Sequence, residues 1–240
     1  LLLTIAVLPS LLLTVFSIHK FRNVLENEKT NRLLSTSKEI ETILSDFIAP
    51  VLKNSLMSAE NPKVLADLKS SSIESLRLLL TDWLRKDVST QASFFDGQGQ
   101  LLITATRDKN GYPITKKFDP EDQIFLSKSS RGKIEKTQSE FLESDSRNTL
   151  SKVILTKFQK NEVLGWSEQI LTLTSVYLEN LKSRLMCDIF FLDQQSQVII
   201  ASHPDFFLYQ KNVFEKDLNP QGLMNSNFKG QPYRFLVTPI

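Results

Sequence analysis

Two aspartates are the first residues whose spacing suggests chemistry, because paired carboxylates serve as general acid and base in many enzymes. Asp96 and Asp193 each follow a short apolar run and precede a small polar turn and an aliphatic run. An aspartate in such a turn accepts hydrogen bonds from its own main chain. The pattern therefore predicts a turn role for both carboxylates and no catalytic pair.

Histidine and cysteine chemistry is limited by number. The 240 residues include two histidines, His19 and His203, and one cysteine, Cys187. These are too few for a histidine cluster, a multi-cysteine metal site or an intrachain disulfide. His203 has no nucleophile at triad spacing, and Gly97-Gln98-Gly99 leads into a strand pattern where a phosphate-binding loop requires a helix. We expect no catalytic residue, no metal and no cofactor in this chain.

The charges are nearly balanced, since 29 lysines and arginines against 27 aspartates and glutamates give a net charge of +2. A nucleic-acid-binding domain usually concentrates basic residues on one face. We therefore expect no nucleic-acid partner.

The first eighteen residues, Leu1 to Ile18, contain no charged side chain. A helix of that length spans roughly 27 Å, close to the hydrocarbon thickness of a bilayer, so the segment predicts a membrane anchor. A cleaved signal peptide is the alternative. His19, Lys20 and Arg22 follow at once and favour the cytoplasmic side by the positive-inside rule. Because the chain has no initiator methionine and stops inside an apolar stretch, we expect it to belong to a longer protein.

Two helices are expected before the first strand. From Phe21 to Met57 apolar residues recur at three- and four-residue steps, which predicts a long amphipathic stalk helix, bent or locally broken at Pro50. Asn61-Pro62 suits a helix start, and an apolar face continues from there to Trp83. The stalk can pack on the protein's own core, on a second copy, or on both.

A strand–turn–strand pattern occurs twice. The residues from Phe94 to Ile103 align without gaps with those from Phe191 to Ile200, at an offset of 97 residues. In both copies an apolar strand ends in aspartate, a turn follows and an aliphatic strand leaves it, as in a β-hairpin. The offset is that of a small domain and exceeds solenoid periods. We interpret the repeat as two related modules, with chance similarity of two hairpins as the alternative.

The rest of the chain alternates polar stretches with strand and helix patterns. Residues Arg107–Asp122 predict a loop and a helix start, and Gly132–Ser151 predict an irregular stretch. The other expected elements are helices at Ile124–Ser129 and Val176–Leu185 and strands at Val153–Phe158, Val163–Leu173 and Gln231–Ile240. Antiparallel hairpins separated by helices predict an α+β fold.

These elements resemble a double Cache sensor region, the extracytoplasmic ligand-binding type found in bacterial membrane receptors. The likeness rests on the long helix leading to Phe94–Leu101, on Lys160–Gly165 with the strand and helix that follow, and on Asp188–Pro204. It implies tandem PAS-like antiparallel modules behind a membrane helix and a stalk, with a partial second module. The implied domains are a transmembrane helix at 1–18, stalk and lead-in helices at 19–88, a membrane-distal module at 89–185 and a membrane-proximal module at 186–240.

The resemblance also implies a small-molecule site on the distal module. Five residues lie on or beside the strands that would line it, namely Arg107, Tyr112, Lys157, Trp166 and Glu168. The Arg-x-Trp-Tyr type of motif, through which some family members bind amino acids, is absent from the corresponding segment. The alternative is that Trp166 belongs to the core and the charged side chains are solvated.

We therefore expect the periplasmic sensing region of a receptor that Leu1–Ile18 holds in the cell inner membrane and that forms a homodimer through the stalk helix. A small ligand or a partner would shift the distal module, and the stalk would relay the change. A sensor histidine kinase is the first hypothesis for the parent, and the input region of a diguanylate cyclase or chemoreceptor is an alternative. A membrane-anchored structural or protein-docking domain without a ligand is the rival from another class.

Overall fold

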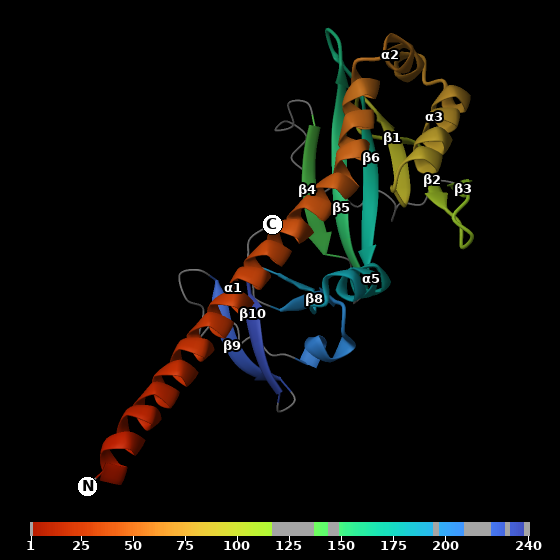
Figure 1. Cartoon of the computed structure of the whole chain (residues 1–240). Coiled ribbons are helices and arrows are strands. Elements are labelled where there is room, and N and C mark those ends of the chain that lie inside the picture. Colours follow the sequence, from red (N-terminus) through yellow and green to blue (C-terminus); the bar gives the residue numbers. More distant parts are fainter. Residues whose placement is uncertain are drawn as a thin grey trace. The chain divides into compact units, whose positions relative to one another are not determined.

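The structure is a computed structural model that describes residues 2–116, 137–143, 149–193, 197–208, 222–228 and 231–237 (Figure 1). The chain divides into two compact units. The first unit combines residues 1–43 with 212–240, and the second unit comprises residues 44–211. The helix predicted at Ile124–Ser129 lies outside the described residues.

Helix α1 (Leu2–Ala59) contains the whole predicted stalk and contributes residues to both units. The sequence predicts a bend or a local break at Pro50, and the break is absent because the helix continues through this residue without interruption. Proline removes one main-chain hydrogen bond from a helix. The neighbouring Val51 is fully buried against Ile154 and Leu171, and burial of a valine side chain contributes about 1.5–3 kcal/mol, which offsets much of that loss.

Most of the membrane segment predicted at Leu1–Ile18 falls on residues 1–13, whose side chains lie outside the described part of the chain. Within the part that is described, no helix is long and apolar enough to cross a membrane.

Two further helices precede the sheet. Helix α2 (Pro62–Lys69) begins where the sequence predicts it, and the Asn61 side chain caps it by accepting a main-chain N–H of the first turn at 2.9 Å. The sequence predicts a single helix from this point to the first strand. Instead the chain breaks at Ser70-Ser71-Ser72 and resumes as α3 (Ile73–Lys86). Serine side chains compete for main-chain hydrogen bonds, and Ser71 takes a left-handed conformation with a φ of 51°.

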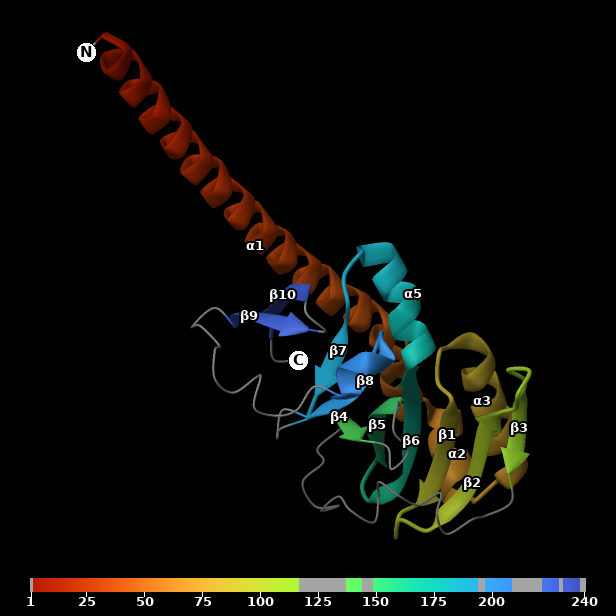
Figure 2. The ribbon, with the colours of Figure 1, turned by 90° about the horizontal axis from the view of Figure 1, so that it is seen from below.

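The second unit is built on a six-stranded antiparallel sheet with the order β3-β2-β1-β6-β5-β4 (Figures 1 and 2). Its strands are β1 (Gln91–Asp96), β2 (Leu101–Arg107), β3 (Pro113–Lys116), β4 (Thr137–Glu143), β5 (Thr149–Gln159) and β6 (Val163–Thr174). The predicted first hairpin is confirmed as β1–β2, and the predicted strand pair after it is confirmed as β5–β6.

Two strands lie where the sequence predicts none. Strand β3 falls in the predicted loop Arg107–Asp122, and β4 falls in the predicted irregular stretch Gly132–Ser151. Both are edge strands of the sheet. An edge strand pairs on one side only and often carries polar residues, so its sequence need not show the apolar run of a central strand.

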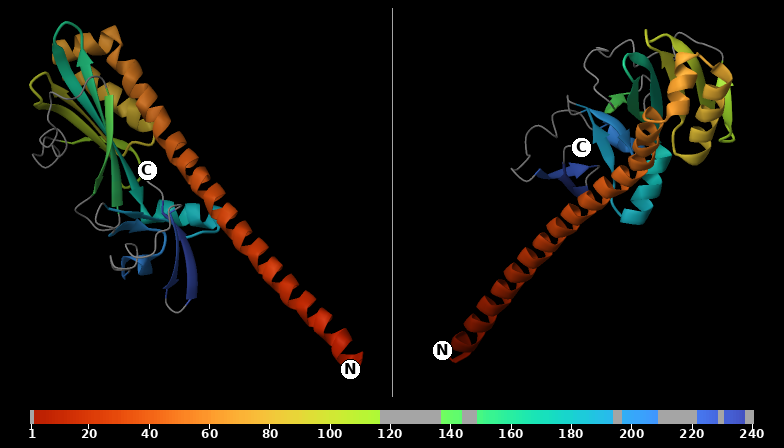
Figure 3. Two further views of the ribbon diagram at one scale, coloured as in Figure 1. Left: turned by 90° about the vertical axis from the view of Figure 1, so that its left-hand side faces the viewer. Right: turned by 90° about the horizontal axis from the view of Figure 1, so that it is seen from above.

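Helices cover one face of this sheet (Figure 3). The main core joins Leu80 and Trp83 of α3 to Phe94 of β1 and Phe158 of β5. The ring centroids of Trp83 and Phe94 lie 5.2 Å apart, and those of Phe94 and Phe158 lie 5.6 Å apart. The last turns of α1 continue this layer over β5 and β6, so the helical lead-in predicted from the sequence forms the cover of the sheet.

The second hairpin, β7 (Phe190–Leu192) with β8 (Val198–Ala201), pairs in the same register as the first. Phe191 pairs with Ile200 as Phe94 pairs with Ile103, and a register shift follows at the same place in both copies. Each hairpin is preceded by a helix, α3 in the first case and α5 (Ser175–Leu185) in the second, as the sequence predicts for α5. The likeness between the two segments thus extends to individual residue pairs and to the bulge.

The 3₁₀ helix η3 (Pro204–Leu208) follows the second hairpin. In the first unit, β9 (Leu223–Phe228) and β10 (Gln231–Leu236) form an antiparallel pair. Strand β10 confirms the strand predicted from Gln231, whereas β9 is too polar to show in the sequence pattern.

Candidate ligand-binding face

The face of the six-stranded sheet that points away from α2 and α3, called the far face below, carries a row of polar side chains at its centre. Side chains alternate along a strand, and residues directly paired across strands share a face. Ser93 of β1 pairs with Thr104 of β2 on one side and with Glu168 of β6 on the other. The three side chains therefore form one row across three adjacent strands.

This row is buried. Ser93 is 0%, Thr104 1% and Glu168 1% exposed. The hydroxyl oxygens of Ser93 and Thr104 lie 2.8 Å apart, within hydrogen-bond distance. A carboxylate in such a position carries its charge into the interior of the sheet, where cations and hydrogen-bond donors interact with it more strongly than in water.

The neighbouring row contains Trp166 and Lys157, which pair directly between β6 and β5. The Lys157 ammonium lies 5.8 Å from the centroid of the Trp166 ring, a cation–π distance. Trp166 is 3% exposed and packs with Phe95 and Leu155. Its Nε1–H has no acceptor among the described residues, although a buried indole N–H usually has one.

The two rows offer complementary chemistry within one face. The Glu168 carboxylate suits an ammonium group, the Trp166 N–H suits an oxygen acceptor, and the surrounding apolar side chains suit a small aliphatic or aromatic group. Apolar side chains with a few polar groups among them are the usual lining of small-molecule sites. Across the described residues there is also no group of three or more histidine, cysteine or acidic side chains that could hold a metal ion.

Of the five residues that the sequence singles out, the structure brings Lys157, Trp166 and Glu168 together on the far face. Arg107 lies on the face of β2 that the helices cover. Its guanidinium donates hydrogen bonds to the main-chain oxygens of Asp87, Ser89 and Gly111 at 2.6, 2.9 and 3.1 Å. It fastens the end of α3 to the β2–β3 turn.

Tyr112 does not join this group either. It lies in the β2–β3 turn with 69% of its surface exposed. Its main-chain N–H donates to the Asp108 carboxylate at 2.8 Å, so the described contact of this residue belongs to the turn.

Ser93 and Thr104 are far-face residues that the sequence analysis did not select. The sequence contains a feature by which Ser93 could have been selected, since it is the one residue with a hydroxyl group in the apolar run from Ala92 to Phe95. A polar residue in a buried strand requires a partner, and the pairing with Thr104 supplies it.

The other groups considered for chemistry have structural partners. Asp96 Oδ1 accepts the main-chain N–H groups of Gln98 and Gln100 at 2.9 and 2.8 Å, and Asp193 Oδ1 accepts that of Gln197 at 2.7 Å. The predicted turn role of both aspartates is therefore confirmed.

Cys187 and His203 lie outside the strands of the six-stranded sheet. Cys187 helps to line a cavity of about 310 Å³ at the end of α5, together with Lys182, Ser183, Met186 and Asp188. The ammonium of Lys182 and the carboxylate of Asp188 form an ion pair of 2.7 Å there. His203 Nδ1 accepts the main-chain N–H of Asp205 at 3.2 Å. None of the five residues predicted to bind a ligand lines this cavity.

Comparison of the sequence with protein-family models and with curated proteins found no match. Comparison of the structure with solved structures found sensory domains. The ligand-binding domain of the Campylobacter jejuni chemoreceptor Tlp3, in complex with L-valine, matches with a TM-score of 0.61 and 12% identity over 88% of this chain and 86% of that one. A domain of a sensory box/GGDEF family protein from Vibrio parahaemolyticus matches with a TM-score of 0.57 and 12% identity, covering 85% and 86%.

The ligand-binding domain of the Pseudomonas fluorescens chemoreceptor CtaA, in complex with L-isoleucine, gives a TM-score of 0.54 and 15% identity, covering 89% of this chain and 85% of that one. At these identities the likeness concerns the fold. The chain has the fold of these sensory domains, as the Cache resemblance of its sequence implies.

Proposed function

We propose that this chain is the extracytoplasmic sensing region of a bacterial signal-transduction receptor and that it binds a small molecule on the far face of its six-stranded sheet. The observation that carries the proposal is the match to sensory domains over 88% of the chain. The buried row of Ser93, Thr104 and Glu168, beside Trp166 and Lys157, supports a ligand site on this face.

The proposed ligand is a small molecule with an ammonium group, a hydrogen-bond acceptor and an apolar part. Glu168 would contact the ammonium group, the Trp166 N–H would donate to the acceptor, and Phe95 and Leu155 would contact the apolar part. The structural neighbours from C. jejuni and P. fluorescens are complexes with L-valine and L-isoleucine, which makes these two amino acids the first compounds to test here.

The proposed parent is a receptor of the inner membrane, with Leu1–Ile18 as its anchor and the rest of the chain in the periplasm. The absence of charged residues from Leu1–Ile18 supports the anchor. A homodimer through α1 is part of the proposal, and the exposed apolar side chains of Phe21, Val24 and Leu34 on this helix support it. Light scattering of the full chain in detergent would measure the mass of the protein component, and a monomer at all concentrations would contradict the dimer.

The proposed division into modules follows the repeat. Residues 89–185 would form the membrane-distal module with the ligand site, and residues 186–240 would contribute to a membrane-proximal one. The matching register of β1–β2 and β7–β8 supports this division. Chemoreceptors and a GGDEF family protein are among the structural neighbours. We therefore keep a chemoreceptor and a diguanylate cyclase, together with a histidine kinase, as candidates for the parent receptor.

A thermal-shift experiment on the purified chain tests the ligand. A compound present at about 100 times its Kd stabilises the folded state by about 2.7 kcal/mol, which raises Tm by roughly 5–10 °C for a chain of this size. The panel would contain the twenty amino acids, short-chain amines and carboxylic acids. No stabilisation by any of them would count against direct sensing of such ligands and favour the protein-docking alternative.

Three variants locate the site. Trp166→Phe removes the indole N–H and keeps an aromatic ring, and Glu168→Gln removes the charge. We expect each to weaken binding at least about tenfold, because each removes a partner of a polar ligand group. Glu162→Gln, in the exposed turn of the same hairpin, is the matched control and should bind as the unmodified chain does. Equal affinity of all four proteins would place the ligand elsewhere.

A further inference from the structure

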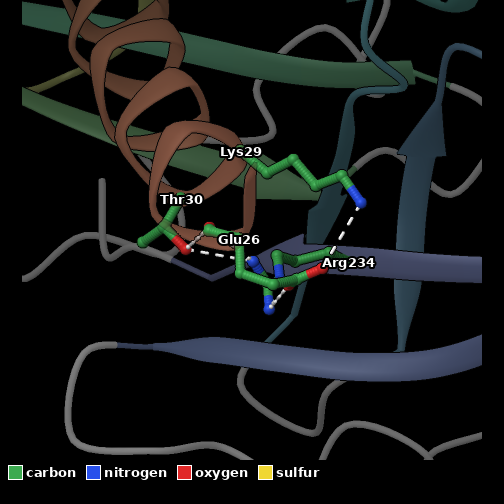
Figure 4. Close-up of polar contacts among 4 residues, drawn as sticks. All are labelled: Glu26, Lys29, Thr30 and Arg234. Atoms are coloured by element: carbon green, nitrogen blue, oxygen red, sulfur yellow. Dashed lines mark hydrogen bonds and ion pairs between the residues drawn. The ribbon is translucent and has the colours of Figure 1, made fainter. Parts of the chain in front are cut away.

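An arginine of the last described strand reaches helix α1 in the first unit (Figure 4). The Arg234 Nη2 lies 2.6 Å from Glu26 Oε2. Its Nη1 donates to the main-chain oxygen of Glu26 at 3.1 Å and to the Thr30 hydroxyl at 3.0 Å. One guanidinium thus joins segments that are more than 200 residues apart in the sequence.

The three acceptors are held in place by the helix itself. The Thr30 hydroxyl donates its own proton to the Glu26 main-chain oxygen at 2.9 Å, which leaves a lone pair of the hydroxyl oxygen for Arg234. Charge-assisted bonds of a planar guanidinium depend strongly on geometry. Arg234 therefore recognises a specific arrangement on α1, with a carboxylate, a carbonyl and an oriented hydroxyl.

The charged residues around Glu26 also favour one axial position of α1 relative to Arg234. Lys29 lies on the same side of α1, with its ammonium 3.4 Å from Glu26 Oε1. One turn before Glu26 the helix carries Arg22, and one turn after it carries Thr30. A displacement of α1 by one turn, about 5.4 Å, would bring either a like charge or an uncharged hydroxyl opposite Arg234.

We propose that Arg234 is a register latch, which fastens the β9–β10 hairpin to α1 at one axial position. While the latch is closed, the hairpin follows any displacement of the helix. Loss of either charge releases the hairpin from the helix and leaves the pairing of β9 with β10 intact. The latch is independent of the ligand site proposed above.

Many ion pairs on protein surfaces contribute nothing measurable to stability. Two features distinguish this contact. The Arg234 side chain is only 24% exposed, and it binds one carboxylate and two further oxygens at once.

Hydrogen exchange followed by mass spectrometry tests the latch in the full chain. We expect Arg234→Gln and Glu26→Gln each to speed amide exchange in peptides covering residues 222–237 by about two- to fivefold, the range that the coupling in measured ion pairs implies. The double variant should exchange no faster than either single one. A second double variant, Glu26→Arg with Arg234→Glu, exchanges the two charges. It should restore part of the protection of the amides in residues 222–237.

Lys29→Gln is the matched control, because Lys29 contacts Glu26 but not the hairpin in the described structure. It should leave exchange in residues 222–237 unchanged. Unchanged exchange in both Arg234→Gln and Glu26→Gln would overturn the proposal, as would additive effects in the double variant. Failure of every compound in the thermal-shift panel would leave these exchange results unaffected, so the two proposals fail separately.

Discussion

Three hairpin turns in the second unit are each closed by the carboxylate of an aspartate. Asp96 Oδ1 accepts two main-chain N–H groups of its own turn, and Asp108 Oδ1 accepts those of Asn110 and Tyr112 at 2.9 and 2.8 Å. Asp193 Oδ1 accepts the main-chain N–H of Gln197 in the second hairpin of the repeat. These carboxylates satisfy turn donors that would otherwise depend on water.

Asp96 should therefore matter to stability. We expect Asp96→Ala to lower the free energy of unfolding by about 1–3 kcal/mol, because two donors lose a charged acceptor. Asp96→Asn keeps an acceptor oxygen and should lose less. Urea denaturation followed by circular dichroism measures both.

Asp82→Ala serves as the control for that change. Asp82 is exposed and forms an i,i+4 pair with Lys86, so its removal should cost little. If Asp82→Ala and Asp96→Ala were equally destabilising, the turn role of Asp96 would lose its support.

Glu26 gives the latch a defined pH dependence. The Arg234 guanidinium, and after it Lys29, holds the pKa of the Glu26 carboxyl below its ordinary value. A carboxyl with a lowered pKa in the folded state contributes stability above its unfolded pKa, and this contribution is lost as the pH falls through the folded pKa. We expect hairpin exchange, corrected for the intrinsic pH effect, to be constant near neutrality and to rise under acid conditions.

The charged groups that face Glu26 on the described elements are Arg234 from β10 and Lys29 from α1, with Arg22 one turn away. The change is assigned to the Glu26 carboxyl, whose pKa these cations lower. Glu26→Gln should be insensitive to pH over the same range. An equal acid response in this variant would assign the effect to another group.

At the level of the elements, close approach of β6 to β1 depends on Gly165. A Cβ at this position would meet the main-chain oxygen of Phe95 at a distance that no real side chain adopts, and it would lie 3.1 Å from the Leu68 side chain of α2. The strand pairing and the helix cover thus meet at one residue without a side chain.

Gly165→Ala should consequently destabilise the second unit by about 1–3 kcal/mol, the usual cost of overpacking. Calorimetry or urea denaturation measures the effect. Leu68→Ala in the same chain should not rescue it, because the main-chain oxygen of Phe95 cannot move away. Rescue by the Leu68 change would show that the side-chain contact limits the fit and not the strand pairing.

The sequence predicts the central elements of the fold better than its edges. Strands β1, β2, β5 and β6 contain apolar runs that the sequence shows, and α5 shows its helical period. The edge strands β3 and β4 are polar, and the break at Ser70-Ser71-Ser72 depends on local hydrogen bonds that apolar periodicity does not detect.

The candidate site is predictable only in part for a related reason. Trp166 and Glu168 are two residues apart on one strand, so a common face follows from the sequence. Whether Arg107 shares that face depends on the register between β1 and β2, including the shift between Phe94 and Phe95. A shift of one residue moves a side chain to the other face of the sheet, and composition does not reveal it.

At the scale of the whole chain, the repeat is the feature in which sequence and structure agree most closely. The two copies are 97 residues apart in the sequence. The paired residues, the bulge and the aspartate that closes the turn are found at the same offset in the structure. The surroundings differ, because β1 and β2 belong to a six-stranded sheet whereas β7 and β8 form a sheet of two strands.

This arrangement also bears on the order in which the chain folds. Each hairpin joins residues that are close in sequence, whereas β1 pairs with β6 across a long intervening segment, for instance Gln91 with Ile170. Closing a long loop costs more entropy than closing a short one, and local pairings form within about 1–10 μs. We expect pulse-labelled refolding to protect the β1–β2 turn before the β1–β6 ladder, and the reverse order would contradict this. The twice-used hairpin would then be a starting point for folding as well as a part of the finished structure.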